Sequence, residues 1–202
     1  MMPLRTVTTA ATRNAAALLI LVAVMISGCG INTIPTQEEQ AKAAWSEVQN
    51  QYQRRADLIP NLVNTVRGYA TQEREVLTQV TEARAKATMV QVNANDLTDP
   101  QALQRFQQAQ AQLSGALGRL LAVSENYPDL KSNQNFLSLQ SQLEGTENRI
   151  TVARRDYIQA VQTYNTEVRT FPGRLWAVVY SAKPMATFTT PEENQRPPTV
   201  QF

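Results

Sequence analysis

The sequence contains no histidine, a single cysteine and only 7 glycines among its 202 residues. Histidine is the commonest general base near neutral pH and a frequent metal ligand, so the usual means of both functions are missing. One cysteine allows no internal disulfide, and the fold must therefore be stabilised by packing. Scarce glycine with abundant alanine and glutamine favours helix, because glycine loses the most backbone freedom on entering one.

The chain also lacks a charge imbalance once its N-terminus is set aside. Arg5 and Arg13 are the only charged residues of positions 1–28, and the remaining chain has 17 basic and 17 acidic residues. A neutral body is poorly suited to neutralising a phosphate backbone. The composition therefore argues against nucleic-acid binding and assigns the basic excess to targeting.

The N-terminus has the three parts of a secretory signal. The polar segment 1–14 contains Arg5 and Arg13, the apolar run AAALLILVAVMI occupies positions 15–26, and small residues follow. That run is shorter than the roughly 20 residues that span a bilayer comfortably. Ile26-Ser27-Gly28-Cys29 also resembles a bacterial lipobox, which predicts cleavage before Cys29 and lipid attachment to its thiol. The alternative is an uncleaved signal anchor, and both hypotheses tether the following domain to a membrane.

Composition divides the chain into four segments. We predict a lipoprotein-type signal peptide or signal anchor at 1–28, a linker at 29–36, a helical bundle at 37–172 and a C-terminal tail at 173–202. The apolar run at 175–180 predicts a helical turn that packs on the bundle. Prolines are frequent in the last part of the tail, which predicts extended structure there.

From about residue 37 to residue 92 the apolar residues follow a sustained heptad, as in coiled coils and other helices that pack at small angles. Arg55 and Glu73 are the only charged residues on it. Pro60 lies in the middle, and proline normally kinks or breaks a helix. Because the heptad keeps its phase across Pro60, we predict one long helix kinked near residues 56–60, with two separate helices as the alternative. The heptad comprises Ala41, Val48, Arg55, Leu62, Tyr69, Val76, Ala83 and Val90, and also Trp45, Tyr52, Ile59, Val66, Glu73, Val80 and Ala87.

Two further helices follow. Asp99-Pro100 is typical of a helix start, with Asp99 as the cap, and the apolar stripe after it continues to Tyr127-Pro128. Ser132 is the predicted cap of a third long helix that ends at Phe171-Pro172-Gly173. Its stripe repeats every seven residues at Phe136, Leu143, Ile150, Tyr157, Tyr164 and Phe171. Short connections make neighbouring helices antiparallel, so the predicted fold is all-α, an elongated antiparallel bundle of three to four long helices.

Several motifs together resemble the LemA family of membrane-associated bacterial helical proteins. The resemblance extends over roughly residues 40–202 and implies an elongated helical bundle held at a membrane, with no defined biochemical activity. Many family members resemble single-pass proteins, whereas this chain has the lipobox-like segment. The motifs are RRADLIPNLV at 54–63, RGYA at 67–70, ERE at 73–75, TEARA at 81–85, ENYPDLK at 125–131, LQSQLEGTEN at 139–148, ARRDY at 153–157, YN at 164–165, FP at 171–172 and PPTVQF at 197–202.

The charged heptad residues are candidates for interaction or for fixing helix register. Arg55 must find a partner or reach solvent, because burying an unpaired guanidinium is costly. Glu73 lies 18 residues away, about 27 Å along a straight helix, so the two cannot pair with each other. Each then needs a partner on another segment. The candidate residues are Arg54, Arg55, Asp57, Glu73, Glu147 and Arg155, with Arg154 and Glu167 as further possible partners.

Carboxylate pairs offer the only plausible catalytic or metal chemistry. Glu73 with Glu75, and Glu144 with Glu147, are the best pairs, but dimetal bundles add Glu-x-x-His repeats that this sequence lacks. No phosphate-binding glycine loop and no serine with a recognisable base are present. We therefore predict no catalytic residue, no metal and no cofactor.

The leading hypothesis is a non-enzymatic, membrane-tethered helical scaffold or adaptor of the bacterial cell envelope. It would contact the membrane through lipidated Cys29 or the apolar segment, and bind an envelope protein or a second copy through its long helical faces. The alternative is a membrane-surface or lipid-binding module, which requires a basic or apolar exposed face beside the tether. An enzyme or carboxylate metal site is the weakest alternative.

Overall fold

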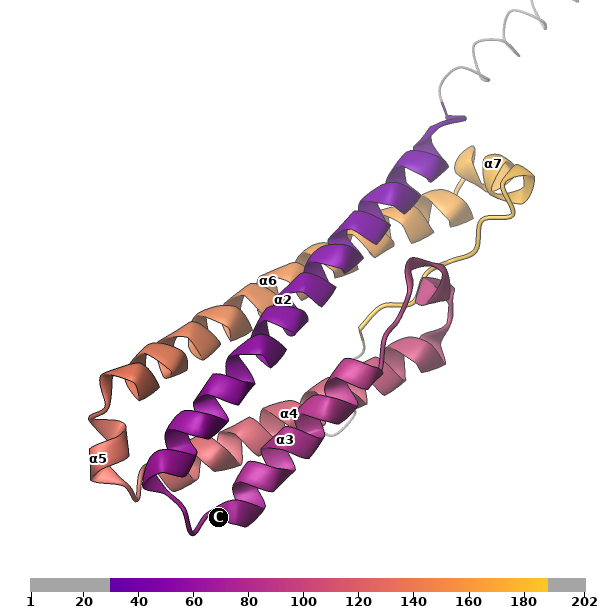
Figure 1. The fold of residues 1–202 in the computed structure, drawn as a ribbon. Coiled ribbons are helices and arrows are strands. Elements are labelled where there is room, and N and C mark those ends of the chain that lie inside the picture. Colours follow the sequence, from indigo (N-terminus) through magenta and orange to yellow (C-terminus); the bar gives the residue numbers. More distant parts are fainter. Residues whose placement is uncertain (1–29, 189–202) are drawn as a thin grey trace, which may run out of the picture.

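The computed structural model describes residues 30–188, all of whose regular elements are helices (Figure 1). They are α2 (Thr33–Tyr69), α3 (Arg74–Met89), the 3₁₀ helix η1 (Ala94–Thr98), α4 (Pro100–Ser124), α5 (Pro128–Lys131), α6 (Gln134–Arg169) and α7 (Gly173–Val179). None of these helices is long and apolar enough to cross a bilayer. The predicted signal or anchor at 1–28, Cys29 and the end of the tail lie outside the described residues.

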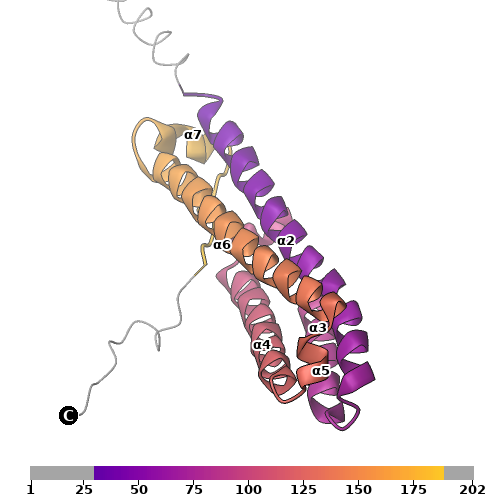
Figure 2. The ribbon, with the colours of Figure 1, turned by 90° about the vertical axis from the view of Figure 1, so that its left-hand side faces the viewer.

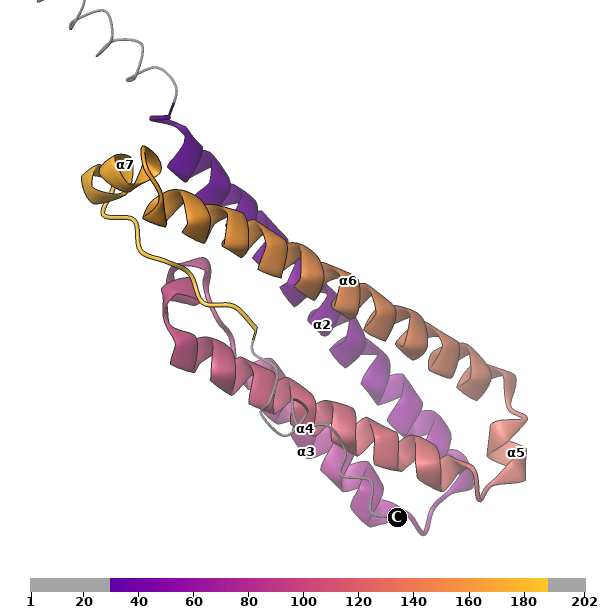
Figure 3. The ribbon, with the colours of Figure 1, turned by 180° about the vertical axis from the view of Figure 1, so that it is seen from behind.

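The helices form an elongated antiparallel bundle, which confirms the predicted fold class. α2 and α6 run the length of the described bundle side by side (Figures 1 and 2). α3 and α4 form a shorter hairpin beside the half of α2 that ends at Tyr69 (Figure 3). α7 lies at the opposite end of the bundle, next to the start of α2.

The first helix differs from its prediction. α2 continues through Pro60, which is exposed, and ends at Tyr69, where the chain turns back into α3. The prediction of one helix that reaches residue 92 was therefore wrong, and so was the alternative of two helices separated at Pro60. Folding α3 back buries Leu77, Val80, Ala83 and Ala87 against α2 and α4. A straight continuation would have carried these side chains beyond the end of the bundle into water.

The starts of the later helices follow from capping. Asp99 caps α4 as predicted, its carboxylate accepting a hydrogen bond from the Gln101 backbone N–H at 2.9 Å. Asn133, not Ser132, caps α6, because its side-chain oxygen accepts from the N–H groups of Asn135 and Phe136. The short α5 was not predicted; it occupies the turn that Pro128 begins.

The end of α6 is a tight corner. Phe171, predicted on the buried stripe, is 77% exposed because α6 ends at Arg169 and the chain turns away. A Cβ on Gly173 would lie 2.3 Å from the Glu167 carbonyl oxygen, so only glycine allows this close approach. The corner lets α7 fold back and bury Ala177, which confirms the predicted helical turn against the bundle.

The core consists of two apolar clusters arranged along the bundle. One lies towards α7 and contains Trp45, Phe106, Tyr157 and Phe188 among others. The other lies towards α5 and contains residues such as Leu62, Leu113 and Phe136. Between them, α2, α4 and α6 each place polar side chains in the interior.

Candidate functional site

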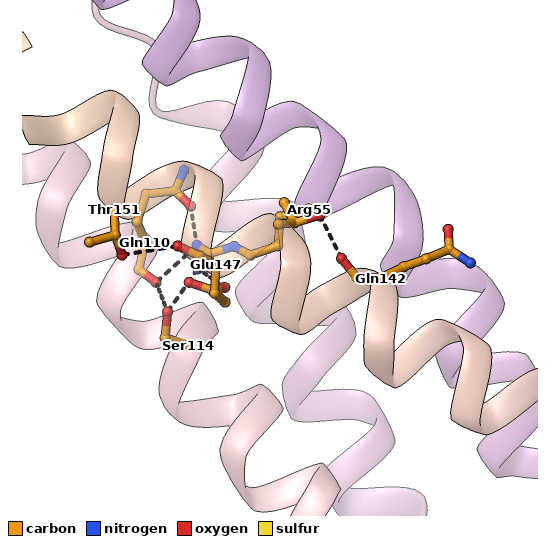
Figure 4. A network of polar contacts seen from close by, with 7 residues as sticks. Arg55, Gln110, Ser114, Gln142, Glu147 and Thr151 are labelled. Atoms are coloured by element: carbon orange, nitrogen blue, oxygen red, sulfur yellow. Dashed lines mark hydrogen bonds and ion pairs between the residues drawn. The ribbon is translucent and has the colours of Figure 1, made fainter. Parts of the chain in front are cut away.

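Arg55 is the central residue of this polar layer. It lies on α2 between Tyr52 of the first cluster and Ile59 of the second, and it is 1% exposed. A buried guanidinium requires hydrogen-bond partners for its donors and a compensating charge. Two other helices supply a carboxylate and acceptors for the terminal nitrogens Nη1 and Nη2, whereas the buried Nε has no hydrogen-bond partner within residues 30–188 (Figure 4).

The guanidinium is held by α4 and α6. Its Nη1 donates to Glu147 Oε1 at 2.8 Å and to Ser114 Oγ at 2.9 Å. Its Nη2 donates to the Gln110 side-chain oxygen at 2.6 Å and to the Gln110 carbonyl at 3.3 Å. The ring of Tyr52 lies 5.0 Å from the guanidinium carbon, a distance at which a cation–π contact adds to the binding.

The same layer extends to the fourth helix. Gln110 Nε2 donates to the carbonyl oxygen of Ala87 at the end of α3. Polar contacts thus join α2, α3, α4 and α6 at one level of the bundle. A shift of any one helix by a turn would leave Arg55 or Gln110 buried without partners, so the layer selects one alignment of the four helices.

A groove of about 560 Å³ lies directly above this layer, between α4 and α6. Its floor is formed by Tyr52 and Arg55, and carboxamides line its α4 wall. Glu147 and Arg154 give the α6 wall one charge of each sign. The lining residues are Tyr52, Arg55, Gln104, Gln107, Gln108, Gln110, Ala111, Ser114, Glu147, Ile150, Thr151 and Arg154.

A family model described as the LemA family matches residues 44–202. The chain belongs to the LemA family. Among its relatives, MamQ 1 and MamQ 2, magnetosome proteins of Paramagnetospirillum magneticum, are 28% identical to it over 168 residues, which is 75% of this chain and 62% of each relative. Protein LemA of Metamycoplasma hominis is 26% identical over 140 residues, or 69% of this chain and 60% of that protein. The chain thus spans about three fifths of the curated relatives it matches.

The LemA bundle brings only some of the candidate residues together. Arg55 contacts Glu147, one of the partners considered from the sequence. Glu73 lies instead in the turn before α3, where its Oε1 accepts from the Tyr127 hydroxyl at 3.0 Å. Arg155 pairs with its neighbour Asp156 on the exposed surface. Glu73 thus has a partner on another segment, but this partner is Tyr127 and not one of the candidates on α6, because α2 ends before Glu73.

Arg54 and Asp57 lie on the outer face of α2. Arg54 is exposed, and Asp57 accepts a hydrogen bond from Gln53 one turn earlier at 2.8 Å. Around the helix Arg54 lies about 100° and Asp57 about 200° from buried Arg55, and both side chains are exposed. Their predicted interaction role is compatible with this exposure and stays a prediction.

The carboxylates considered for catalysis or metal binding are engaged separately. Glu75 accepts from Gln79 and Glu144 from Gln140, each along its own helix, while Glu73 and Glu147 have the partners given above. Within residues 30–188 no three acidic, cysteine or histidine side chains lie close enough to hold a metal. The described part of the chain therefore offers carboxylates as structural hydrogen-bond acceptors.

Gln110 and Ser114 were not singled out from the sequence. Gln110 lies four residues after Phe106 and three before Leu113, on the apolar stripe of α4. A polar residue at a stripe position was the available signal, because it must find a partner when buried. Its pairing with Arg55 could not be read from α4 alone.

The bundle also binds the extended segment 182–188; the sequence predicted a tail that packs on the bundle or is extended, but none of the contacts that hold it. The Asn165 carboxamide donates to the Met185 carbonyl and accepts from the Met185 N–H, both at 2.8 Å. The hydroxyls of Tyr157 and Tyr164 donate to the carbonyls of Ala186 and Lys183. Phe188 packs on Trp45 and Tyr157. Side chains of α6 thus form hydrogen bonds with the backbone of this segment and pack against its apolar residues.

Burial raises the pKa of the Tyr157 and Tyr164 hydroxyls above that of a free tyrosine. Ionisation is therefore easier in the unfolded chain, and these groups stabilise the fold fully below about pH 10 and lose that contribution as the pH rises further. We expect the melting temperature to fall steeply above this pH. Tyr157→Phe should reduce the fall, at a cost of about 1 kcal/mol at neutral pH for the lost hydrogen bond. Thermal melts followed by circular dichroism, with exposed Tyr180→Phe as control, test this; equal falls in the two variants would contradict it.

Proposed function

We propose that this protein is a non-enzymatic, membrane-tethered helical scaffold of the bacterial cell envelope, and that it binds a protein segment in the groove between α4 and α6. The observation that carries the proposal is the groove itself, which opens on a polar layer that ties four helices together. Because the groove is formed by rigid helices, its side chains are in place before a partner binds, which lowers the entropic cost of binding.

The groove chemistry favours a peptide backbone as its occupant. Glutamine side chains both donate and accept hydrogen bonds, as a peptide group does. Asn165 already holds the backbone of Met185 in this way on the same helix, α6. Arg55 is sealed in the floor, whereas Glu147 is 47% exposed and Arg154 is partly exposed, so these two would contact charges on the partner.

Support for the tether comes from the sequence and the relatives. The apolar run at 15–26 and Cys29 precede the described bundle, and LemA resemblance implies a membrane-associated protein. Two of the relatives carry names that assign them to magnetosomes. A tethered rod with a binding groove is an adaptor in the ordinary sense, because it places a bound partner at a set distance from the bilayer.

Site-specific photocrosslinking in the native envelope tests the groove. A photoreactive residue at Gln108, which lines the groove, should give a discrete crosslinked product, and one at Gln101, exposed on the same helix outside the groove, should not. Adding Ala111→Arg, which places a bulky charge in the groove, should abolish the Gln108 product. Equal products from both positions, or a product that survives Ala111→Arg, would contradict binding in this groove.

A further inference from the structure

Exposed apolar side chains gather at the α7 end of the bundle. Phe171 and Val178 are each 77% exposed and Val179 is 69% exposed. More than half of the large exposed apolar residues of positions 30–188 lie at this end: Ile31, Phe171, Leu175, Val178, Val179 and Tyr180. Exposed apolar side chains gathered at one end of a folded protein indicate an interaction site.

The apolar residues of α7 share one face of the helix. Leu175, Val178 and Val179 have the spacing that places side chains on a common side, while Ala177 is buried against the bundle. The short α7 therefore exposes apolar side chains away from the core, and Arg174 is its one charged residue. Exposed apolar helix faces insert into membrane interfaces.

Basic residues surround this face, although the body as a whole is neutral. Arg169, Arg174 and Lys183 are exposed, and the acidic residue nearest to them is Glu167, whose carboxylate lies beside Gly173 at the start of α7. The first acidic residues along α2, Glu38 and Glu39, are both paired with Lys42, at 2.8 and 3.0 Å. At this end of the bundle four basic side chains thus stand against three acidic ones, Glu38, Glu39 and Glu167, and the excess of one positive charge favours anionic headgroups.

The chain enters the bundle at this same end. A Cβ on Gly30 would lie 3.3 Å from Trp176 Nε1, so the residue after Cys29 lies against α7. The apolar run ends at Ile26, four residues earlier, and four extended residues reach at most about 14 Å. A membrane held by either predicted anchor would therefore lie within reach of the α7 face.

We propose that the α7 end is a membrane-docking surface for an anionic bilayer. Leu175, Val178, Val179 and Phe171 enter the headgroup and acyl boundary, and Arg169, Arg174 and Lys183 contact lipid phosphates. The proposal rests on the tether of the proposed function and is independent of the groove. Docking at two points orients the rod, and Arg55, 22 residues along α2 from Thr33, is then held about 33 Å from the end that touches the bilayer.

Tryptophan quenching by brominated lipids tests the docking in the full chain reconstituted in vesicles. The chain has two tryptophans, Trp176 at the α7 end and Trp45 buried in the core. We expect lipid bromines to quench the native protein but not Trp176→Phe, whose remaining tryptophan is shielded. Quenching should be stronger in equimolar phosphatidylcholine and phosphatidylglycerol than in phosphatidylcholine alone. Flotation of the vesicles reports the tether separately.

Matched variants separate docking from other causes. Val178→Glu with Val179→Glu should abolish the bromolipid quenching, while Val152→Glu, the same substitution at an exposed valine on α6, should leave it unchanged. Each neutralisation, Arg174→Gln or Lys183→Gln, should lower the ratio of docked to undocked protein about fivefold in anionic vesicles. Circular dichroism confirms that the variants keep their helix content.

Each result decides between clear alternatives. A chain that floats with the vesicles but whose Trp176 is not quenched overturns the docking and leaves the tether intact. A chain that does not float overturns both. Unquenched Trp176 together with a dimer in sedimentation, dissociated by the α7 glutamates, assigns this surface to a second copy instead of lipid.

Discussion

Replacing Trp45 with alanine is expected to lower the free energy of unfolding by about 4 kcal/mol, which is the usual cost of removing a buried aromatic side chain from a packed core. Trp45 is 1% exposed, and its ring lies 5.3 Å from that of Phe106 and 5.2 Å from that of Tyr157. Its indole N–H also donates to the Val92 carbonyl at 2.9 Å, leaving that acceptor to Gln49 alone after the substitution. The loss of stability thus has two causes: a cavity in the core, and one hydrogen bond fewer to the loop that contains Val92.

The consequence should extend to segment 182–188. Phe188 packs on both Trp45 and Tyr157, so the substitution removes one of the two rings that Phe188 contacts. We expect limited proteolysis to cleave within this segment faster in Trp45→Ala than in the parent chain. Urea titration measures the stability, and Met89→Ala, at a site 79% exposed, is the control, with a change below about 0.5 kcal/mol. Equal urea midpoints for the two variants would rule out the proposed central role of Trp45.

The second large effect concerns the polar layer. Glu147→Leu is expected to cost about 2 kcal/mol, because Arg55 keeps its charge in a buried position and loses the one anionic partner that it has within residues 30–188. This value lies below that of a fully enclosed ion pair, since water reaches the half-exposed carboxylate. In a chain of this size the melting temperature should fall by roughly 4–8 °C.

A double-mutant cycle distinguishes pairing from simple packing. Arg55→Met with Glu147→Leu should be more stable than Glu147→Leu alone, because the second substitution removes the uncompensated charge. Glu144→Leu, three residues earlier on α6 and exposed, should change stability by less than about 0.5 kcal/mol. Additive effects of Arg55→Met and Glu147→Leu would show that the ion pair carries no coupling energy and would remove its role in alignment.

Periodicity and local chemistry were sufficient for the helices and for part of the site. The apolar stripes predicted an elongated all-α bundle, and Asp99 before Pro100 predicted the start of α4, because capping depends on neighbouring residues only. Arg55 is a charged residue on the apolar heptad of α2, and this position predicted that it would need a partner. These conclusions depend on interactions within one turn of helix or on the cost of burying one charge.

Other features depended on contacts between residues far apart in the chain. The heptad runs on through residues 70–73, and only the burial of α3 against α2 and α4 turns the chain there. Gln110 and Ser114 became partners of Arg55 because packing brought α4 to that level, 55 and 59 residues along the chain. The gathering of basic and apolar residues around α7 likewise required the corner at Gly173. A one-dimensional pattern states which side chains must be buried or paired, whereas the choice of partner is a property of the packed bundle, in which the arrangement that buries the most apolar surface with the fewest unpaired polar groups prevails.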